Sequence, residues 1–171
     1  MELTNEGRTN QIPIVTKLAA GEIMLIILGA DHAAFQAKEA LKSFIQQTGQ
    51  DEVEDVGTFS EQSCHYPEFA QKVSQRLKQV PAALGVLLCG TGIGMSMVAN
   101  RYAHIRAALC QHPEEARLAR EHNNANVLCL GARILTAAQI KAIFLAFREG
   151  QFSGGRHQAR LDLFASLGEK L

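Results

Sequence analysis

The sequence lacks an excess of charge of either sign. Its lysines and arginines number 17, and its aspartates and glutamates also number 17. A protein that binds nucleic acid or an anionic membrane usually carries a basic surplus. We therefore expect neither partner, and any anion that the protein binds must be held by a local cluster of residues.

The sequence also lacks the patterns of a zinc protein, a secreted protein or a membrane protein. Its cysteines are Cys64, Cys89, Cys110 and Cys129, and no two of them form a C-x-x-C pair or a zinc-like spacing. The longest apolar runs have the length of a strand, which is too short to span a bilayer. Because no basic segment followed by an apolar stretch opens the chain, we expect no signal peptide and a cytoplasmic location. No metal or other cofactor is expected.

Residues 1–23 differ from the remainder of the chain. They mix polar residues with a short apolar patch at 12–15. We predict an N-terminal extension there, either partly disordered or packed on the surface. The following residues, 24–171, are enough for one domain with a full core.

From Met24 onward, strand patterns alternate with helix patterns. Uninterrupted apolar runs such as MLIILG and LGVLLC are typical of strands that are buried on both faces. Strands are predicted at 24–29, 52–56, 84–89, 106–110 and 127–130, and helices at 33–47, 67–80, 95–101, 113–122, 137–148 and after 155. This alternation predicts parallel strands with right-handed crossovers. The expected fold is α/β: a three-layer αβα sandwich with a Rossmann-like parallel sheet and an extra C-terminal helix.

Polar residues cluster at four places where strands or helices should end. In parallel sheets of this kind, ligands bind beyond the carboxyl ends of the strands. The four clusters are Asp31-His32, the segment CGTGIG at 89–94, His122-Asn123, and GGRHQAR at 154–160. These clusters are therefore the candidates for a functional site.

The segment CGTGIG places a glycine-rich turn between a strand and a helix. Gly90, Gly92 and Gly94 let backbone N–H groups converge on an anion, and a following helix would add its positive end. The spacing G-x-G-x-G differs from the dinucleotide fingerprint, and no Gly-Lys-Ser/Thr of a Walker loop follows. A nicotinamide cofactor is therefore not expected. The glycines alone fit a tight turn and an anion site equally well.

Cys89 and the basic residues each allow a structural and a chemical interpretation. A strand cysteine is ordinarily a small buried hydrophobe, but a thiol beside a helix N-terminus can serve as a base or nucleophile. The glycine loop after Cys89 favours the chemical role. His32 and His122 are either ordinary surface or structural residues or proton-transfer groups. Arg156 and Arg160, four residues apart, form either a solvated basic edge or a phosphate clamp.

Six segments, in this order, resemble the family of ribose-5-phosphate isomerase B and galactose-6-phosphate isomerase. They are GADH (29–32), YP (66–67), CGTGIG (89–94), NRYAHIRAA (100–108), AREHNNANVLCLGAR (119–133) and GGRHQAR (154–160). The resemblance covers residue 24 to about residue 165. It implies an aldose–ketose isomerase that needs no metal and that assembles as a homodimer or tetramer with its sites at the subunit interface.

The resemblance also implies a role for each matching residue. Cys89 is similar to the base that carries a proton between C2 and C1 of the sugar, and His122 to the residue that opens the furanose ring. The segment Gly90, Thr91, Gly92, Ile93 and Gly94 matches the loop that binds the enediolate, with the Thr91 hydroxyl assisting proton transfer. Asp31, Tyr66 and Asn123 match contacts to substrate hydroxyls. His32, Arg133, Arg156 and Arg160 match the phosphate pocket. His157, which lies between the two last arginines in the sequence, is also predicted to bind the substrate.

Some questions stay open at this level. His65 stands where the family usually has an aspartate before Tyr-Pro, which leaves the local hydrogen bonding and the substrate preference undetermined. Ribose 5-phosphate is the expected substrate, and a six-carbon sugar phosphate such as allose 6-phosphate or galactose 6-phosphate is the alternative. A module that binds a sugar phosphate without turning it over is a third possibility, although it would need neither a thiol nor a histidine around the anion.

Overall fold

Five parallel strands form the sheet of the computed structural model, which describes residues 23–167. The strands are β1 (Met24–Ala30), β2 (Asp51–Asp55), β3 (Leu84–Cys89), β4 (Ala107–Leu109) and β5 (Val127–Gly131). Their order across the sheet is β2-β1-β3-β5-β4. The central strand β3 is buried along its whole length, as its apolar sequence predicts.

The helices connect the strands and follow the capping signals of the sequence. They are α1 (Phe35–Thr48), α2 (Tyr66–Gln79), α3 (Ile93–Ala99), α4 (Pro113–Asn123), α5 (Ala137–Glu149) and α6 (Arg156–Asp162), with short 3-10 helices at His32–Ala34 and Leu163–Ser166. Gly49 ends α1 in the left-handed region with φ 64°. Thr136 caps α5 by accepting a hydrogen bond from the Gln139 amide.

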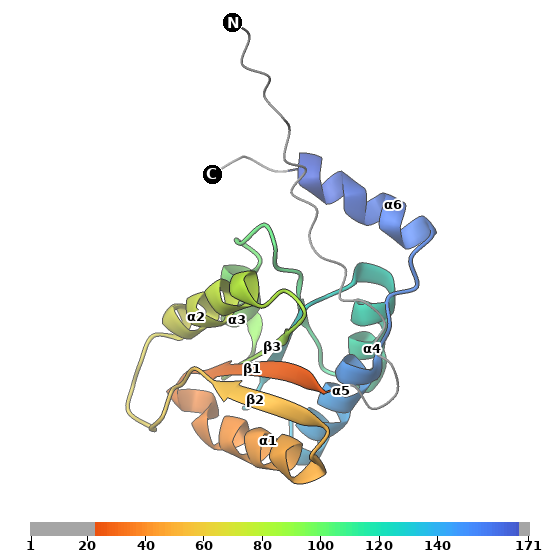
Figure 1. Ribbon diagram of the computed structural model, residues 1–171. Helices are drawn as coiled ribbons and strands as arrows, with labels where there is room; N and C mark the ends of the chain where they lie inside the picture. The colour runs from red at the N-terminus through yellow and green to blue at the C-terminus, as the bar shows by residue number, and fades with distance from the viewer. Residues whose placement is uncertain (1–22, 168–171) are drawn as a thin grey trace, which may run out of the picture.

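The sheet is covered on both faces, which makes three layers (Figure 1). Leu41 of α1, Ala116 of α4 and Phe144 of α5 pack on one face. Phe69 of α2 and Met95 of α3 pack on the other. The predicted αβα sandwich is therefore confirmed.

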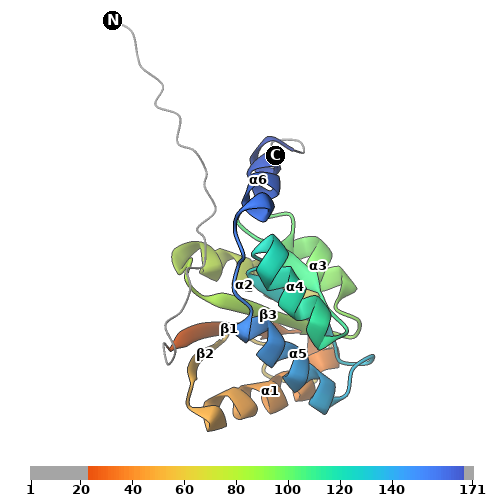
Figure 2. The ribbon, with the colours of Figure 1, turned by 90° about the vertical axis from the view of Figure 1, so that its right-hand side faces the viewer.

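Helix α6 belongs to neither layer. In two perpendicular views it projects beyond α4, away from the sheet (Figure 1 and Figure 2). Leu163 and Phe164, which directly follow α6, are 60% and 49% exposed. The predicted extra C-terminal helix is thus present. The apolar residues that follow it are exposed to solvent in the single chain.

A buried ion pair supports the carboxyl end of β1. The Lys38 side chain of α1 is fully buried and contacts Asp55 at the end of β2. Burial alone would raise the pKa of Asp55, but hydrogen bonds from Lys38, Lys42 and the Gly57 amide lower it. The Gly57 carbonyl in turn accepts the Ala30 amide at 2.7 Å. The pair therefore fixes the loop that borders the end of β1.

Most predicted element boundaries hold to within two residues. The clearest difference is the helix expected at 95–101, which begins at Ile93 and ends at Ala99. The proposed N-terminal extension lies outside the described residues, except for Ile23. Within residues 23–167, no helix combines the length and the apolar character needed to cross a bilayer. Over the same range, no group of three or more His, Cys, Asp or Glu side chains could hold a metal ion.

Candidate active site

The strand order places two of the predicted clusters side by side. The chain moves from β1 to β2 in one direction across the sheet and then returns past β1 to β3. This reversal makes the gap between the carboxyl ends of β1 and β3 the switch point, where sheets of this kind bind ligands. Asp31 follows β1 there and its amide donates to the Leu88 carbonyl of β3 at 3.2 Å. Cys89 follows Leu88 as the last residue of β3, so the Asp31 and Cys89 clusters lie side by side.

The thiol of Cys89 lies inside the turn that follows it. Its side chain is 6% exposed, and its Sγ accepts a hydrogen bond from the Gly92 amide at 3.1 Å. Gly92 has φ 78°, a left-handed conformation that favours glycine. This contact holds the sulfur at the turn, beside the backbone amides that follow β3.

The turn is shorter than the sequence predicted. Ile93 and Gly94 belong to the first turn of α3, so the irregular segment covers only Gly90, Thr91 and Gly92. Thr91 is exposed, and its Oγ1 accepts the Ile93 amide at 3.4 Å. The Thr91 hydroxyl proton is therefore available to a bound molecule.

Gly131 at the end of β5 supports the turn, which the sequence analysis did not foresee. A Cβ atom at Gly131 would lie 2.7 Å from the carbonyl carbon and oxygen of Thr91. The next two amides continue the contact between the strands: Ala132 donates to the Cys89 carbonyl at 2.8 Å and Arg133 to the Gly90 carbonyl at 2.9 Å. The role of Gly131 could have been predicted only from the pairing of β3 with β5, which places Gly131 opposite Cys89.

Arg133 and Tyr66 border the turn from two sides. The Arg133 side chain lies against Gly90, where a Cβ atom would be 3.3 Å from the Arg133 Cδ. The Tyr66 ring lies over Gly94, where a Cβ atom would be 2.7 Å from the ring. The role of Gly94 is thus to seat Tyr66, which is 38% exposed. We call residues 89–92 the Cys89 loop. Two predicted substrate contacts, Arg133 and Tyr66, therefore flank this loop.

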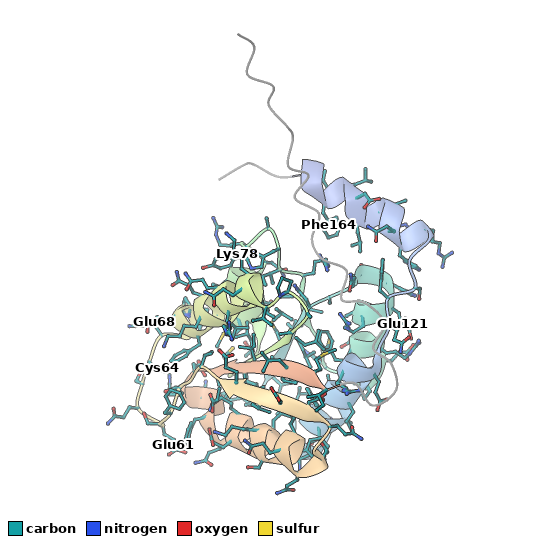
Figure 3. All side chains as sticks on the ribbon, viewed as in Figure 1. Glu61, Cys64, Glu68, Lys78, Glu121 and Phe164 are labelled. Atoms are coloured by element: carbon teal, nitrogen blue, oxygen red, sulfur yellow. The ribbon has the colours of Figure 1, made fainter. Side chains whose placement is uncertain are left out.

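Asp31 and His32 are held by hydrogen bonds to the backbone. The Asp31 Oδ1 accepts the Ala33 amide at 3.0 Å, and the His32 Nδ1 accepts the Cys64 amide at 3.2 Å. A backbone amide can only donate, so Nδ1 carries no proton and the neutral His32 ring keeps its proton on Nε2. Cys64, beside α2 in Figure 3, thereby fixes the His32 tautomer. His65, which stands where the family usually has an aspartate, caps α2 without a side-chain hydrogen bond.

The remaining predicted residues form a second group on α4 and α6. His122 and Asn123 end α4, whereas Arg156, His157 and Arg160 lie on α6. The His122 and His157 rings are stacked, with centroids 4.2 Å apart and planes 7° from parallel. Asn123, Arg156 and Arg160 are exposed. Figure 3 labels Glu121 on α4 and Phe164, which lies just after α6.

The two groups are separate within the single chain. Among residues 23–167, no hydrogen bond, ion pair or ring contact joins the Cys89 loop to the second group. The structure thus brings together Asp31, His32, Tyr66, the Cys89 loop and Arg133. It places His122 and the arginines of α6 elsewhere.

The other thiols differ from Cys89 in their surroundings. Burial, with the nearby charge of Glu115, raises the pKa of Cys110 to about 12. Burial also raises the pKa of Cys129, whose side chain is wholly enclosed. Neither thiol can act as a base near neutral pH. Cys64 is half-buried and Cys89 is the one that faces a turn of backbone amides.

Comparison with known proteins agrees with this geometry. A family model described as Ribose/Galactose Isomerase matches residues 26–164. The ribose-5-phosphate isomerase B of Escherichia coli K12 is 37% identical over 145 residues, which cover 85% of this chain and 97% of that protein. The crystal structure of a ribose 5-phosphate isomerase from Thermotoga maritima has a TM-score of 0.82 and 47% identity, and the match covers 85% of this chain and all of that one.

A third similar protein was solved with a sugar phosphate. The ribose-5-phosphate isomerase B of Mycoplasma genitalium, whose structure contains bound ribulose 5-phosphate, has a TM-score of 0.80 and 36% identity. The match covers 85% of this chain and 96% of that chain. The switch point in the sheet, the thiol at its turn and these similarities lead to one conclusion: the chain belongs to the ribose/galactose isomerase family.

Proposed function

We propose that the protein interconverts ribose 5-phosphate and ribulose 5-phosphate by proton transfer through an enediolate. The observation that carries the proposal is the Cys89 thiol at the switch point, with the Gly92 amide 3.1 Å from its sulfur. An aldose–ketose isomerase needs a base over the carbon, donors for the enediolate oxygens and an anchor for the phosphate. The names of the Escherichia coli and Mycoplasma genitalium relatives support the five-carbon substrate.

The proposed reaction starts with the cyclic sugar. His122 opens the furanose ring by giving a proton to the ring oxygen while the C1 hydroxyl loses one. The Cys89 thiolate then removes the proton from C2, and the negative charge spreads over O1 and O2 as an enediolate. Amides of the Cys89 loop stabilise that charge. The thiol returns its proton to C1, and the Thr91 hydroxyl passes the remaining proton from O2 to O1.

The other predicted residues bind the substrate in this proposal. Asp31, Tyr66 and Asn123 contact sugar hydroxyls. Arg133, which lies against Gly90, contributes to the phosphate pocket together with His32. Because the His32 Nδ1 accepts the Cys64 amide, His32 would donate to the phosphate through its Nε2.

The arginines of α6 complete the site of a second subunit in this proposal. Arg156 and Arg160 are exposed on a helix that stands away from the sheet, and Leu163 and Phe164 beyond it are exposed as well. A two-fold homodimer would cover these apolar residues and bring the arginines to the neighbouring Cys89 loop. His157 lies on α6 with these arginines, and His122 of α4 stacks on it. His122 would therefore reach the neighbouring site together with the arginines. The protein would act in the cytoplasm, in the pentose phosphate pathway.

The test is a direct assay of substrate preference. The purified protein is offered ribose 5-phosphate, allose 6-phosphate and galactose 6-phosphate in turn, and formation of each ketose phosphate is measured. We expect the largest kcat/KM with ribose 5-phosphate. A larger value with a six-carbon sugar would transfer the proposal to that substrate. Binding of all three sugar phosphates without turnover would refute isomerisation and would indicate that the protein only binds sugar phosphates.

A further inference from the structure

The chain returns onto the end of α4 through a turn that only its glycines explain. The Ser153 amide donates to the Glu121 carbonyl at 2.9 Å, one residue before His122. Gly154 and Gly155 follow with φ 62° and 53°. A Cβ atom at either glycine would meet nothing within 4 Å, so the backbone conformation and not space requires glycine there. This turn directs the first residues of α6 back toward His122.

His157 is the residue that this turn brings onto α4. Its side chain is 8% exposed, although its neighbours Arg156 and Ala159 are exposed. The ring lies flat on the ring of His122, with centroids 4.2 Å apart and planes 7° from parallel. A face-to-face contact leaves the edges of both rings, where the nitrogen atoms lie, open to other groups.

No hydrogen bond within the described chain orients the His122 ring, although the charge of Glu114 acts on it. Among residues 23–167, no hydrogen bond reaches either of its nitrogen atoms, and its one ring contact is with His157. A histidine that transfers protons ordinarily has its orientation set by a hydrogen bond to one nitrogen. Here the stack takes the place of that bond and leaves both nitrogen atoms free.

We propose that His157 is a positioning residue for His122, whose ring it holds by stacking so that the proton-transferring edge meets the sugar. This inference rests on the proposed role of His122 in ring opening. His157 itself touches neither substrate nor the reacting atoms in this account. The sequence analysis predicted that His157 binds the substrate beside Arg156 and Arg160, whereas the stack gives it a different task.

The charges around the pair fit this division of roles. Burial lowers the pKa of His157, and the charges of His122, Arg156 and Arg160 lower it further. Burial and these neighbouring charges therefore favour the neutral form of His157. Two parallel imidazolium rings at this distance would repel each other.

The chemistry of the two sugars provides the test. Ribose 5-phosphate is mainly a furanose and must open before it can enolise. Ribulose 5-phosphate cannot close a furanose, because the oxygen on its C5 carries the phosphate. Exchange of its C1 protons in deuterated water therefore reports enolisation alone, without ring opening.

The test compares two variants of His157. His157→Phe keeps a flat ring of similar size, and His157→Leu keeps an apolar side chain but removes the stack. We expect His157→Leu to lower kcat from ribose 5-phosphate about tenfold, because a misplaced proton donor costs rate without weakening binding. Its KM and the exchange at C1 of ribulose 5-phosphate should stay within about twofold of the unaltered protein. His157→Phe should retain kcat within about twofold.

A structural readout accompanies the kinetics. The ring protons of His122 should show the upfield NMR shift of a stacked ring in the unaltered protein and in His157→Phe, and should lose it in His157→Leu. Equal loss of kcat in both variants would overturn the proposal, because a flat ring would then not suffice. A fall in C1 exchange as large as the fall in turnover would also overturn it, since the defect would then lie outside ring opening.

His122→Asn separates this inference from the function on which it rests. If His122→Asn impairs turnover of ribose 5-phosphate while His157→Leu does not, only the positioning role of His157 is refuted. If His122→Asn leaves turnover of ribose 5-phosphate intact, the proposed ring-opening role itself fails.

Discussion

Cys89 differs from the chain's other buried thiols in what surrounds its sulfur. Cys110 and Cys129 lie in the core, where burial raises the pKa of each thiol. The sulfur of Cys89 instead accepts a hydrogen bond from the Gly92 amide at the carboxyl end of the central strand β3. Cys89 is the last residue of β3 and lies beside the glycine turn. Cys129 instead lies inside β5, and Cys110 follows β4 with its side chain in the core.

Replacing Cys89 by alanine should remove isomerase activity and keep substrate binding. We expect kcat to fall by at least about a hundredfold, because the proton carrier is lost. Ribose 5-phosphate should still bind, as measured by calorimetry, since the phosphate contacts remain. Cys129→Ala is the matched control: it removes another buried thiol and should retain kcat. Near-normal turnover in Cys89→Ala would exclude Cys89 as the base.

His157 should make stability depend on pH in the mildly acidic range. Burial lowers its pKa below the ordinary 6.5, so the folded state binds fewer protons than the unfolded state. The corresponding stability is fully present above about pH 6.5 and is lost as the pH falls through the lower folded value. Urea unfolding at pH 7.5 and 5.5 should show a smaller difference for His157→Phe. An unchanged difference would contradict a buried neutral ring.

The sequence predicted where the candidate residues lie in the fold better than which groups they contact. The residues after β1 and β3 could be found from strand ends alone, because parallel strands bring their carboxyl ends to one edge. The amide of Cys64 on His32 and the stack of His122 on His157 depend on segments that meet only after folding. No local pattern encodes such contacts.

At the scale of elements, the Cys89 loop depends on how closely β3 and β5 approach. The end of β5 lies against the Thr91 backbone, and the space between them admits no side chain at Gly131. The alternation of strands and helices was predictable from apolar runs and capping residues. The start of α3 at Ile93 was not, because the glycines at 92 and 94 obscured the helix boundary.

Gly131→Ala should therefore damage the site more than the fold. The added Cβ would lie 2.7 Å from the Thr91 carbonyl, and the loop must move away. We expect kcat to fall about tenfold or more, since small displacements of reacting groups are costly.

Gly85→Ala is the matched control for that variant. A Cβ at Gly85, near the other end of β3, would lie 2.9 Å from Val73, so it creates a similar clash away from the loop. It should lower the melting temperature but leave kcat of the folded protein unchanged. If both variants lose kcat equally, the effect belongs to the sheet in general.

At the scale of the whole molecule, the single chain separates two groups of residues that the proposed reaction would bring together. The Cys89 loop follows the central strand β3, whereas His122 on α4 and the arginines on α6 form another group. Figure 1 shows α6 projecting beyond α4, away from the sheet. The sequence predicted a final helix freed by Gly154 and Gly155, and the structure has one. A site shared between two subunits explains both the separation and the exposed residues after α6.

Mixed dimers test that arrangement. Cys89→Ala and Arg160→Ala homodimers should each be nearly inactive. With sites shared between subunits, a mixed dimer has one site with both changes and one with neither. Co-refolding equal amounts should then restore about a quarter of the unaltered activity, by random pairing in a two-fold dimer. No recovery, with mixed dimers shown to form, would place the arginines and Cys89 of one site on the same subunit.

The central claim, proton transfer through an enediolate by Cys89, is tested most directly by isomerisation in deuterated water. Ribose 5-phosphate is incubated with the protein to equilibrium, and proton NMR follows C2 of the aldose and C1 of the ketose. We expect deuterium at C1 of ribulose 5-phosphate and, through the reverse reaction, at C2 of ribose 5-phosphate, with no incorporation by Cys89→Ala. Ribulose 5-phosphate that forms but keeps only protium at C1 throughout equilibration would contradict the account, because the hydrogen would then not pass through an exchangeable thiol.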